Sequence, residues 1–298
     1  MKSEKLVEVK NLKKYFKLDR NTVIKAVDDI SFDIYKGEIF GLVGESGSGK
    51  STTGKSISSI YKPTAGEIFY RGKLISNPKI YRREERIINK SLQIIFQDST
   101  SALNPRMKIK EIIGEPLVIQ KVFKKKEDRM KKVDDLMELV GLDKSYSDKY
   151  PYECSGGQRQ RVGIARALSL DPEFIIADEP IASLDASIQA QIINLFKKLQ
   201  KEKDLTCLFI SHDLAMIKYV CNRVGVMYNG KIVELAETKE LYSNPIHPYT
   251  KILLSSMLIP KPEGKEKRKY ISCNSIISNI SKEKGQLVEV SQGHFVYC

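Results

Sequence analysis

Apolar and polar side chains alternate with the two-residue period of a strand over residues 5–10 and over much of residues 23–34. This pattern predicts an edge strand over residues 5–10 and one or two strands over residues 23–34. The other elements expected here are a turn at 36–38, a buried strand at 39–43, a helix from about Lys50 to Ile60 and a strand at 68–70.

A helical pattern replaces this alternation from Lys110 to about Leu168. The residues Met130, Val133, Met137 and Val140 follow the spacing of one helix face, and Gly141 stands where a C-terminal cap belongs. Strand–helix alternation then returns. It predicts strands at 174–177 and 206–211, a helix at 187–200, a short helix after 211, and a hairpin of 223–228 with 231–235. No strong period follows Tyr249. The pattern as a whole predicts an α/β chain with a helical insertion.

Composition narrows the class of protein. The chain has 298 residues, of which 41% are hydrophobic, so it is long enough for two domains and too apolar to be disordered. No apolar stretch approaches the roughly 20 residues of a membrane span, and the N-terminus lacks the apolar segment of a secretory signal. We therefore expect a soluble, intracellular protein. The five cysteines form no Cys-x-x-Cys pair, which favours reduced thiols over a disulfide framework or a zinc ribbon.

The net charge of +13 leaves three interpretations open. Basic residues concentrate at Lys121–Lys132 and Lys261–Lys269, without the interleaved aromatic side chains of a nucleic-acid surface. A solvated basic face is the first interpretation, an anionic membrane surface the second, and nucleic acid the third.

A glycine-rich loop carries the strongest chemical signal. Residues 44–51 read Gly-Glu-Ser-Gly-Ser-Gly-Lys-Ser, which fits G-x-x-x-x-G-K-[ST] between a predicted strand and a predicted helix. Its glycines let successive backbone N–H groups point at one anion, and the helix N-terminus adds partial positive charge. Lys50 supplies a charge to the β- and γ-phosphates, and Ser51 offers a hydroxyl to Mg²⁺.

Two further segments support nucleotide chemistry. The buried run 174–177 ends in Asp178 and Glu179, where the first carboxylate is suited to Mg²⁺ and the second to activating a water molecule. Ser155 begins a helical stretch with Gly156 and Gly157. Ser155 is a good helix N-cap. The backbone amides of Gly156 and Gly157 at this helix N-terminus predict a second anion site. Two anion sites far apart in sequence suggest one triphosphate bound between two protomers.

These motifs occur in the order found in ABC-transporter ATP-binding subunits, which the chain resembles over roughly residues 5–255. The resemblance implies a P-loop NTPase fold with an antiparallel β subdomain, a helical subdomain at about 98–168 and a short C-terminal extension at 256–298. It also implies binding and hydrolysis of ATP with Mg²⁺.

The resemblance assigns roles to individual residues. It implies catalytic roles for Glu179, His212 (the switch histidine) and Gln97, and Mg²⁺ ligation by Ser51, Gln97 and Asp178. Phe16 resembles the aromatic residue that stacks on adenine, with Tyr15 as the alternative, and Asp185 resembles an aspartate that crosses the dimer interface. The nucleotide-contacting set is Phe16, Gly44, Glu45, Ser46, Gly47, Ser48, Gly49, Lys50, Ser51, Thr52, Ser155, Gly156, Gly157, Gln158 and Asp185.

Further runs resemble the oligopeptide/dipeptide importers and the second of their two paired ATPases. These runs are Phe96-Gln97-Asp98, Leu103-Asn104-Pro105-Arg106-Met107, Asn244-Pro245 and His247-Pro248-Tyr249-Thr250. The implied partners are a paralogous ATPase in a heterodimer, two transmembrane permeases and an extracytoplasmic solute-binding protein, and no nucleic acid. The implied location is peripheral, on the cytoplasmic face of the membrane.

The chain departs from this family at three places. Cys154 replaces the usual Leu or Phe before Ser155, and Ile181-Ala182-Ser183 replaces a more usual Val-Ser-Ala run. The extension keeps only Cys273 and Cys298 of a cysteine motif that holds a [4Fe–4S] cluster in some relatives. Because such a cluster takes four thiolates, we expect no intact cluster.

Three alternatives remain open from the sequence. The same ATPase pattern serves importers of nickel or another small solute. A soluble ABC ATPase acting on DNA or ribosomes is a rival from another class, which the single cassette and the ordinary helical insert argue against. A non-hydrolysing subunit is the third, which the complete set of Lys50, Gln97, Asp178, Glu179 and His212 argues against.

Overall fold

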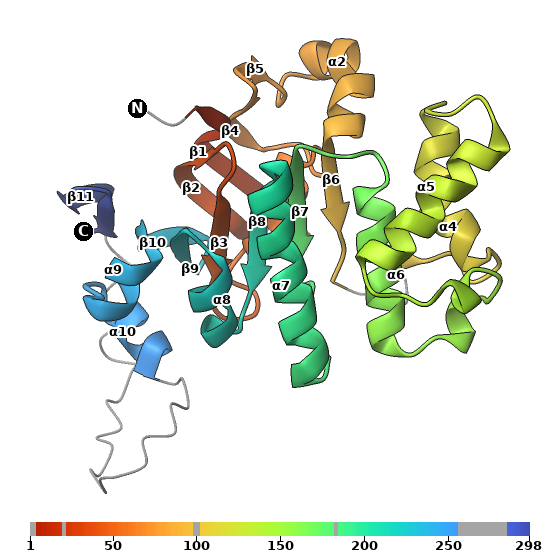
Figure 1. The fold of residues 1–298 in the computed structure, drawn as a ribbon. Helices are drawn as coiled ribbons and strands as arrows, with labels where there is room; N and C mark the ends of the chain where they lie inside the picture. The colour runs from red at the N-terminus through yellow and green to blue at the C-terminus, as the bar shows by residue number, and fades with distance from the viewer. Residues whose placement is uncertain (1–3, 20–21, 98–101, 182–183, 256–284) are drawn as a thin grey trace, which may run out of the picture.

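Two β-sheets organise the chain, for which a computed structural model describes residues 4–19, 22–97, 102–181, 184–255 and 285–298. The strands are β1 Lys5–Lys17, β2 Val23–Tyr35, β3 Ile39–Val43, β4 Ala65–Tyr70, β5 Lys73–Leu74, β6 Leu92–Ile95, β7 Phe174–Asp178, β8 Thr206–Ser211, β9 Arg223–Tyr228, β10 Lys231–Glu237, β11 Leu287–Ser291 and β12 His294–Tyr297. One sheet is antiparallel with the order β2-β1-β4-β5, and the other is mixed with the order β11-β12-β10-β9-β3-β8-β7-β6 (Figure 1).

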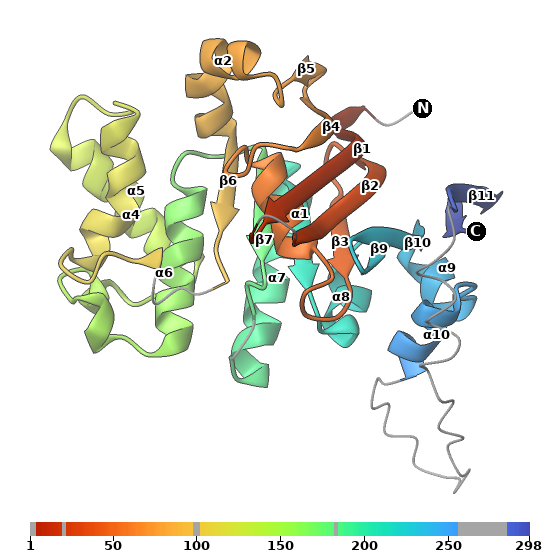
Figure 2. The same cartoon turned by 180° about the vertical axis from the view of Figure 1, so that it is seen from behind.

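Helices cover both faces of the mixed sheet, and further helices lie beyond its two ends. The helices are α1 Lys50–Ile57, α2 Pro78–Ser91, α4 Ile109–Ile119, α5 Lys126–Leu139, α6 Gly156–Leu168, α7 Ala186–Lys203, α8 Leu214–Val220, α9 Thr238–Ser243 and α10 Pro248–Ser255, with 3₁₀ turns at Lys144–Tyr146 and Pro151–Glu153. Helices α7 and α8 lie on one face, and α1 lies on the other, toward the antiparallel sheet (Figure 2). Helices α4, α5 and α6 pack together beyond β6, while α9 and α10 lie at the opposite end.

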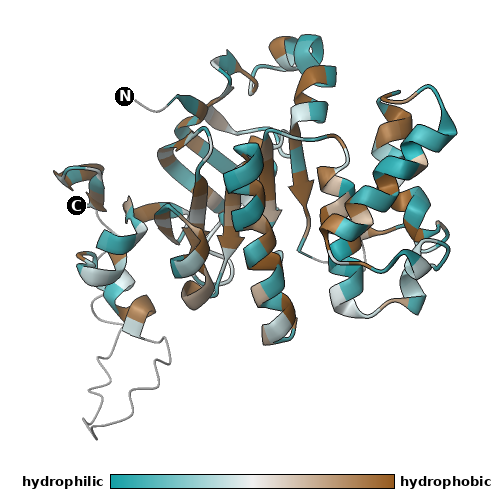
Figure 3. Cartoon of the chain, viewed as in Figure 1, coloured by the Kyte–Doolittle hydropathy of each residue, from teal (hydrophilic) through white to brown (hydrophobic). Residues whose placement is uncertain are grey.

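Alternation along the central strands divides the core into two clusters. In β8, Cys207 and Phe209 face the cluster that contains Phe196 of α7, and their neighbours Leu208 and Ile210 face the one that contains Ile57 of α1. Because both faces are covered, these strands are apolar at nearly every position, as Figure 3 shows. No helix in the described ranges has both the length and the apolarity of a membrane span.

The fold class predicted from the sequence is confirmed, with changes at individual elements. The buried strand at 39–43, the strand at 206–211 and the hairpin at 223–228 with 231–237 are present, and residues 23–35 form one strand. The first helix ends at Ile57, three residues before the predicted end. The prediction of an edge strand at 5–10 is wrong, because β1 pairs with β2 on one side and with β4 on the other.

The C-terminal residues form structure that the sequence pattern did not reveal. β11 and β12 make a hairpin, and β12 pairs antiparallel with β10, so that Phe295 lies opposite Leu235. The hairpin thereby continues the mixed sheet beyond β10. Helix α10 likewise continues the order past Tyr249. The boundary at 255/256 between cassette and extension stays a prediction, and residues 261–269 and Cys273 lie outside the described residues.

Candidate functional site

The predicted chemistry gathers at one edge of the mixed sheet, where four parallel strands end side by side. β3 pairs with β8 through Val43 and Ser211, β8 pairs with β7 through Ile210 and Asp178, and β7 pairs with β6. The segments that follow these strands carry the glycine-rich loop, His212, Glu179 and Gln97. The carboxyl edge of a parallel sheet is where open α/β proteins place their ligand sites.

Two glycines allow the glycine-rich loop to pass close to neighbouring backbone. A Cβ on Gly44 would lie 2.2 Å from the carbonyl oxygen of Met227, and one on Gly49 would lie 2.2 Å from that of Ala26. Both glycines have positive φ, 149° and 107°, which side-chain-bearing residues rarely adopt. The β9–β10 turn adds a hydrogen bond, in which Gly230 N–H donates to Ser48 O at 3.0 Å. The loop is therefore fixed from two sides.

Lys50 lies at the centre of this loop. Its Nζ donates to Gly44 O at 2.8 Å, to Glu45 O at 2.7 Å and to Ser48 Oγ at 3.3 Å. Burial lowers the pKa of Lys50, and the carboxylates of Glu179 and Asp178 oppose this. The loop thus encloses a buried cation that is bound only to neutral oxygens, an arrangement suited to attracting an anion.

Ser51 and Asp178 form an oxygen-rich pair next to this cation. Ser51 Oγ donates to Asp178 Oδ1 at 2.8 Å, which joins the first turn of α1 to the end of β7. Burial raises the pKa of Asp178, and the hydrogen bond from Ser51 opposes the shift. Thr52 follows in the same helical turn and is half-buried. A hydroxyl beside a poorly solvated carboxylate fits Mg²⁺, which takes one or two such protein ligands and completes its shell with phosphate and water.

Glu179 receives two of the predicted side chains. Gln97 Nε2 donates to its Oε2 at 2.9 Å, and His212 Nδ1 lies 3.3 Å from its Oε1. Its backbone has φ of 48°, a left-handed conformation that is uncommon outside glycine. The Glu179 N–H donates to Ile210 O at 3.0 Å, and this bond holds the strained residue on β8. The prediction that Gln97 binds Mg²⁺ stays untested, because the amide contacts Glu179 here.

The second predicted anion site forms a separate recess. Ser155 caps α6 with a reciprocal pair of bonds, in which Gln158 N donates to Ser155 Oγ and Ser155 N donates to Gln158 Oε1. The N-cap prediction is therefore confirmed. A cavity of about 450 Å³ is lined by Ser155, Gly156, Gly157, Gln158 and Asp185, among others. The structure thus brings the glycine motif and Asp185 together, while Ser183 lies outside the described residues.

The predicted adenine-stacking residue lies apart from these contacts. Phe16, at the end of β1, packs edge-on against Tyr61 with ring centroids 5.4 Å apart, and Lys14 Nζ lies 4.9 Å from its ring centre. The alternative, Tyr15, donates its hydroxyl to Asp28. The role of Phe16 remains a prediction.

Sequence reasoning missed Tyr249 as a contact of the phosphate loop. Glu45 N–H donates to the Tyr249 hydroxyl at 3.1 Å, although the two residues are 204 positions apart. In the sequence, the run His247–Thr250 indicates only the resemblance to peptide importers. A wider cavity of about 1160 Å³ between the C-terminal hairpin and the β2–β3 turn contains none of the predicted site residues.

The cysteines give no metal site within the described ranges. Cys154, Cys207 and Cys221 are buried free thiols, and Cys298 is an exposed one. Among the residues that the structure places, no group of three or more His, Cys, Asp or Glu side chains is arranged to hold a metal ion. The expected absence of an iron–sulfur cluster stays a prediction, because Cys273 is not described.

Comparisons with known proteins show what the sequence is similar to. Residues 27–182 match the family model described as ABC transporter, and residues 233–282 match the oligopeptide/dipeptide transporter C-terminal region. The oligopeptide transport ATP-binding protein OppF of Bacillus subtilis (strain 168) is 54% identical over 297 residues, covering 99% of this chain and 97% of the relative. The dipeptide transport ATP-binding protein DppF of Lactococcus lactis subsp. cremoris (strain MG1363) is 46% identical, with 99% and 94% covered.

A solved structure shares the fold. The dimeric ATP-binding cassette MJ0796, in a post-hydrolysis state bound to ADP and phosphate, superposes with a TM-score of 0.71 at 28% identity. The superposition covers 78% of this chain and 98% of the cassette.

Proposed function

This chain belongs to the ABC transporter ATP-binding family, and on that premise we propose that it binds and hydrolyses Mg·ATP to drive import of peptides across a membrane. The observation that carries the proposal is the convergence of Lys50, the Ser51–Asp178 pair and Glu179 at one sheet edge. The match of residues 233–282 to the oligopeptide/dipeptide transporter region supports peptides over nickel as the solute class.

The first step is binding of the triphosphate to the glycine-rich loop. Amides of the glycine-rich loop other than those of Glu45 and Ser48 bind the phosphates together with the buried Lys50 Nζ, and the N-terminus of α1 adds its partial charge. Lys50 exchanges its carbonyl partners in the loop for phosphate oxygens. Ser51 and Asp178 would hold the Mg²⁺, which would neutralise charge on the phosphates.

The second step is hydrolysis at the terminal phosphate. Glu179 accepts a proton from a water molecule, the water oxygen bonds to the terminal phosphorus, and the bond to the leaving ADP oxygen breaks. Gln97 and His212 contact one carboxylate oxygen each and so aim Glu179 at the water. The His212 side chain is 61% exposed, and we propose that its other ring nitrogen contacts the terminal phosphate.

The third step is closure of two ATPase subunits on the nucleotide. The recess of Ser155, Gly156, Gly157 and Asp185 is far from Lys50 in sequence and open to solvent, so we assign it to the nucleotide bound on the paired subunit. We propose that this subunit is a paralogous ATPase and that ATP binding holds the two subunits together head to tail.

The remaining partners follow from the transport role. We propose two transmembrane permease subunits, which contact the surface around Gln97, and an extracytoplasmic solute-binding protein. This places the chain peripherally on the cytoplasmic face of the membrane. We further propose a cassette at residues 1–255, with its helical subdomain at about 98–168, and a C-terminal extension at 256–298 that returns to the sheet through β12.

Reconstitution into proteoliposomes tests the proposal. The chain is combined with its cognate ATPase, permeases and binding protein, and uptake of a labelled peptide is compared with uptake of Ni²⁺. We expect ATP-dependent peptide uptake that Lys50→Ala in this chain lowers at least tenfold. Nickel uptake without peptide uptake would refute the solute class, and unchanged peptide uptake by Lys50→Ala would refute the role of the loop.

A further inference from the structure

Tyr249 joins helix α10 to the phosphate loop. Its side chain is 1% exposed, its hydroxyl accepts from Glu45 N–H at 3.1 Å, and its ring packs on Tyr228 with centroids 4.4 Å apart. Burial raises the pKa of Tyr249 to about 12, so the group beside the loop is a neutral phenol. Glu45 is the second residue of the loop, and its carbonyl accepts from Lys50 Nζ at 2.7 Å. One residue of the loop is therefore held from both sides, by its N–H and by its C=O.

A buried carboxylate fixes the segment that carries Tyr249. Glu234 of β10 is fully buried and accepts from Ile246 N at 2.8 Å and from His247 N at 3.0 Å. His247 Nδ1 in turn accepts from Tyr249 N at 3.2 Å. Since buried polar groups with satisfied partners rigidify a fold, the chain around Tyr249 has one well-defined conformation.

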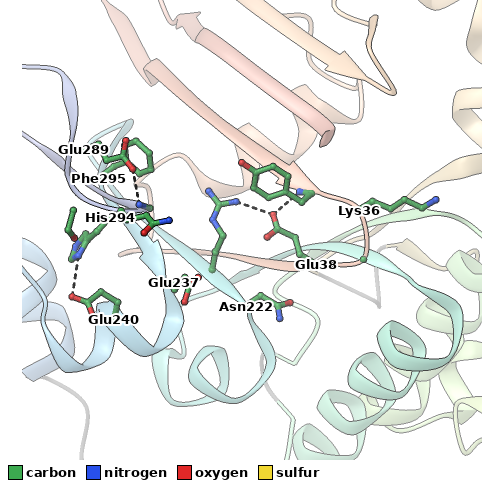
Figure 4. A pocket seen from close by; sticks show the side chains of 14 residues that line it. Lys36, Glu38, Asn222, Glu237, Glu240, Glu289, His294 and Phe295 are labelled. Carbon is green, nitrogen blue, oxygen red and sulfur yellow. Dashed lines mark hydrogen bonds and ion pairs between the residues drawn. The ribbon is translucent and has the colours of Figure 1, made fainter. Parts of the chain in front are cut away.

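The C-terminal hairpin completes this network. His294 of β12 is 1% exposed, and its Nε2 lies 2.8 Å from Glu234 Oε1. Its other ring nitrogen faces Glu240, 3.7 Å away, at the wall of the wide cavity beside the hairpin (Figure 4). A continuous path of bonded residues therefore runs from the hairpin through Glu234 and His247 to Tyr249.

We propose that Tyr249 is a positioning residue for nucleotide binding: by accepting from the Glu45 N–H it fixes the backbone at the start of the loop, so that the amides that follow point at the phosphates. The proposal rests on the proposed function, because it concerns the same phosphate loop. A loop amide contributes to phosphate binding only when it points at the anion, and loop residues without a second anchor lose order on binding. The Tyr249 hydroxyl supplies this anchor in advance of the nucleotide.

The test replaces only the hydroxyl, with Tyr249→Phe in the full-length subunit. The ring keeps its packing on Tyr228, so the fold is retained. Loss of one net hydrogen bond predicts an increase in the KM for Mg·ATP of about three- to tenfold, with kcat within about twofold of the parent. A loss of folded protein would instead lower the apparent kcat at unchanged KM. Tyr228→Phe is the matched control, since it removes a neighbouring hydroxyl and leaves the Glu45 contact in place.

Amide hydrogen exchange in the nucleotide-free subunit gives a second readout that does not depend on ATP. The Glu45 amide exchanges faster in Tyr249→Phe than in the parent, and at the parental rate in Tyr228→Phe. If the parent itself binds no Mg·ATP, the proposed function fails, and the exchange experiment still tests the Tyr249 contact. Unchanged exchange at Glu45, or an unchanged KM despite faster exchange, would overturn the positioning role.

Discussion

The phosphate loop approaches strand β2 closely at Gly49. We therefore predict that adding one methyl group at Gly49 lowers the stability of the fold and weakens Mg·ATP binding. A Cβ at this position would lie 2.2 Å from the Ala26 carbonyl oxygen and 3.1 Å from Met227 Cε. Real Cβ atoms stay at least about 3 Å from other heavy atoms, so backbone must move by roughly 0.8 Å. Since Ala26 belongs to a strand paired with β1, that movement disturbs the antiparallel sheet as well as the loop.

The expected magnitude has two contributions. The backbone φ of 107° costs about 1–3 kcal/mol for a residue with a side chain, and overpacking costs about 1–3 kcal/mol more. A total of about 2–6 kcal/mol is a large fraction of the free energy of unfolding of a typical protein. Gly49→Ala should therefore lower the Tm by about 5 °C or more and weaken Mg·ATP binding.

Gly47→Ala is the matched control within the same loop. Gly47 also has positive φ, 81°, but a Cβ there would meet no atom within 4 Å. Only the conformational cost remains, so the Tm should fall by about half as much as in Gly49→Ala. Differential scanning calorimetry of the two nucleotide-free variants measures this difference. Equal shifts would show that the close contact with Ala26 does not shape the loop.

Two further predictions concern the catalytic carboxylate and the Tyr249 support. Glu179→Gln preserves the length and shape of the side chain but cannot accept the proton, so steady-state hydrolysis should fall about 10²–10⁴-fold with Mg·ATP binding retained. A normal rate would exclude Glu179 as the base. Burial lowers the pKa of His247 in the fold, opposed by Glu234, so protonation favours the unfolded chain and stability falls as pH drops below about 6.5. Unfolding by urea between pH 7.5 and 5.5 should show a weaker pH dependence in His247→Asn than in the parent, and equal slopes would contradict this.

The phosphate loop and the carboxylate pair were predictable because each is encoded in contiguous residues with a specific backbone geometry. Their meeting at one edge also followed, since parallel strands place their carboxyl ends together. The interior position of β1 did not follow, because it depends on pairing with β4, some sixty residues later. Strand pairing over such distances leaves little trace in a local pattern.

Three other features of the structure were not predicted from the sequence. Helix α2 was not predicted, although its segment is amphipathic and Asn77 as N-cap and Pro78 at the first turn were usable signals. β12 has four residues and is stabilised by β10, about sixty positions earlier. The role of Tyr249 rests on a bond to Glu45 across 204 positions, which no local pattern encodes.

Equilibrium binding of Mg·ATP to the purified subunit tests the central claim most directly. Calorimetric titration, with the cognate ATPase present, should show saturable binding at or below millimolar nucleotide. Lys50→Ala should weaken that binding at least tenfold, because it removes the buried cation at the centre of the loop. Absence of binding by the parent, or equal affinity in the variant, would contradict the account.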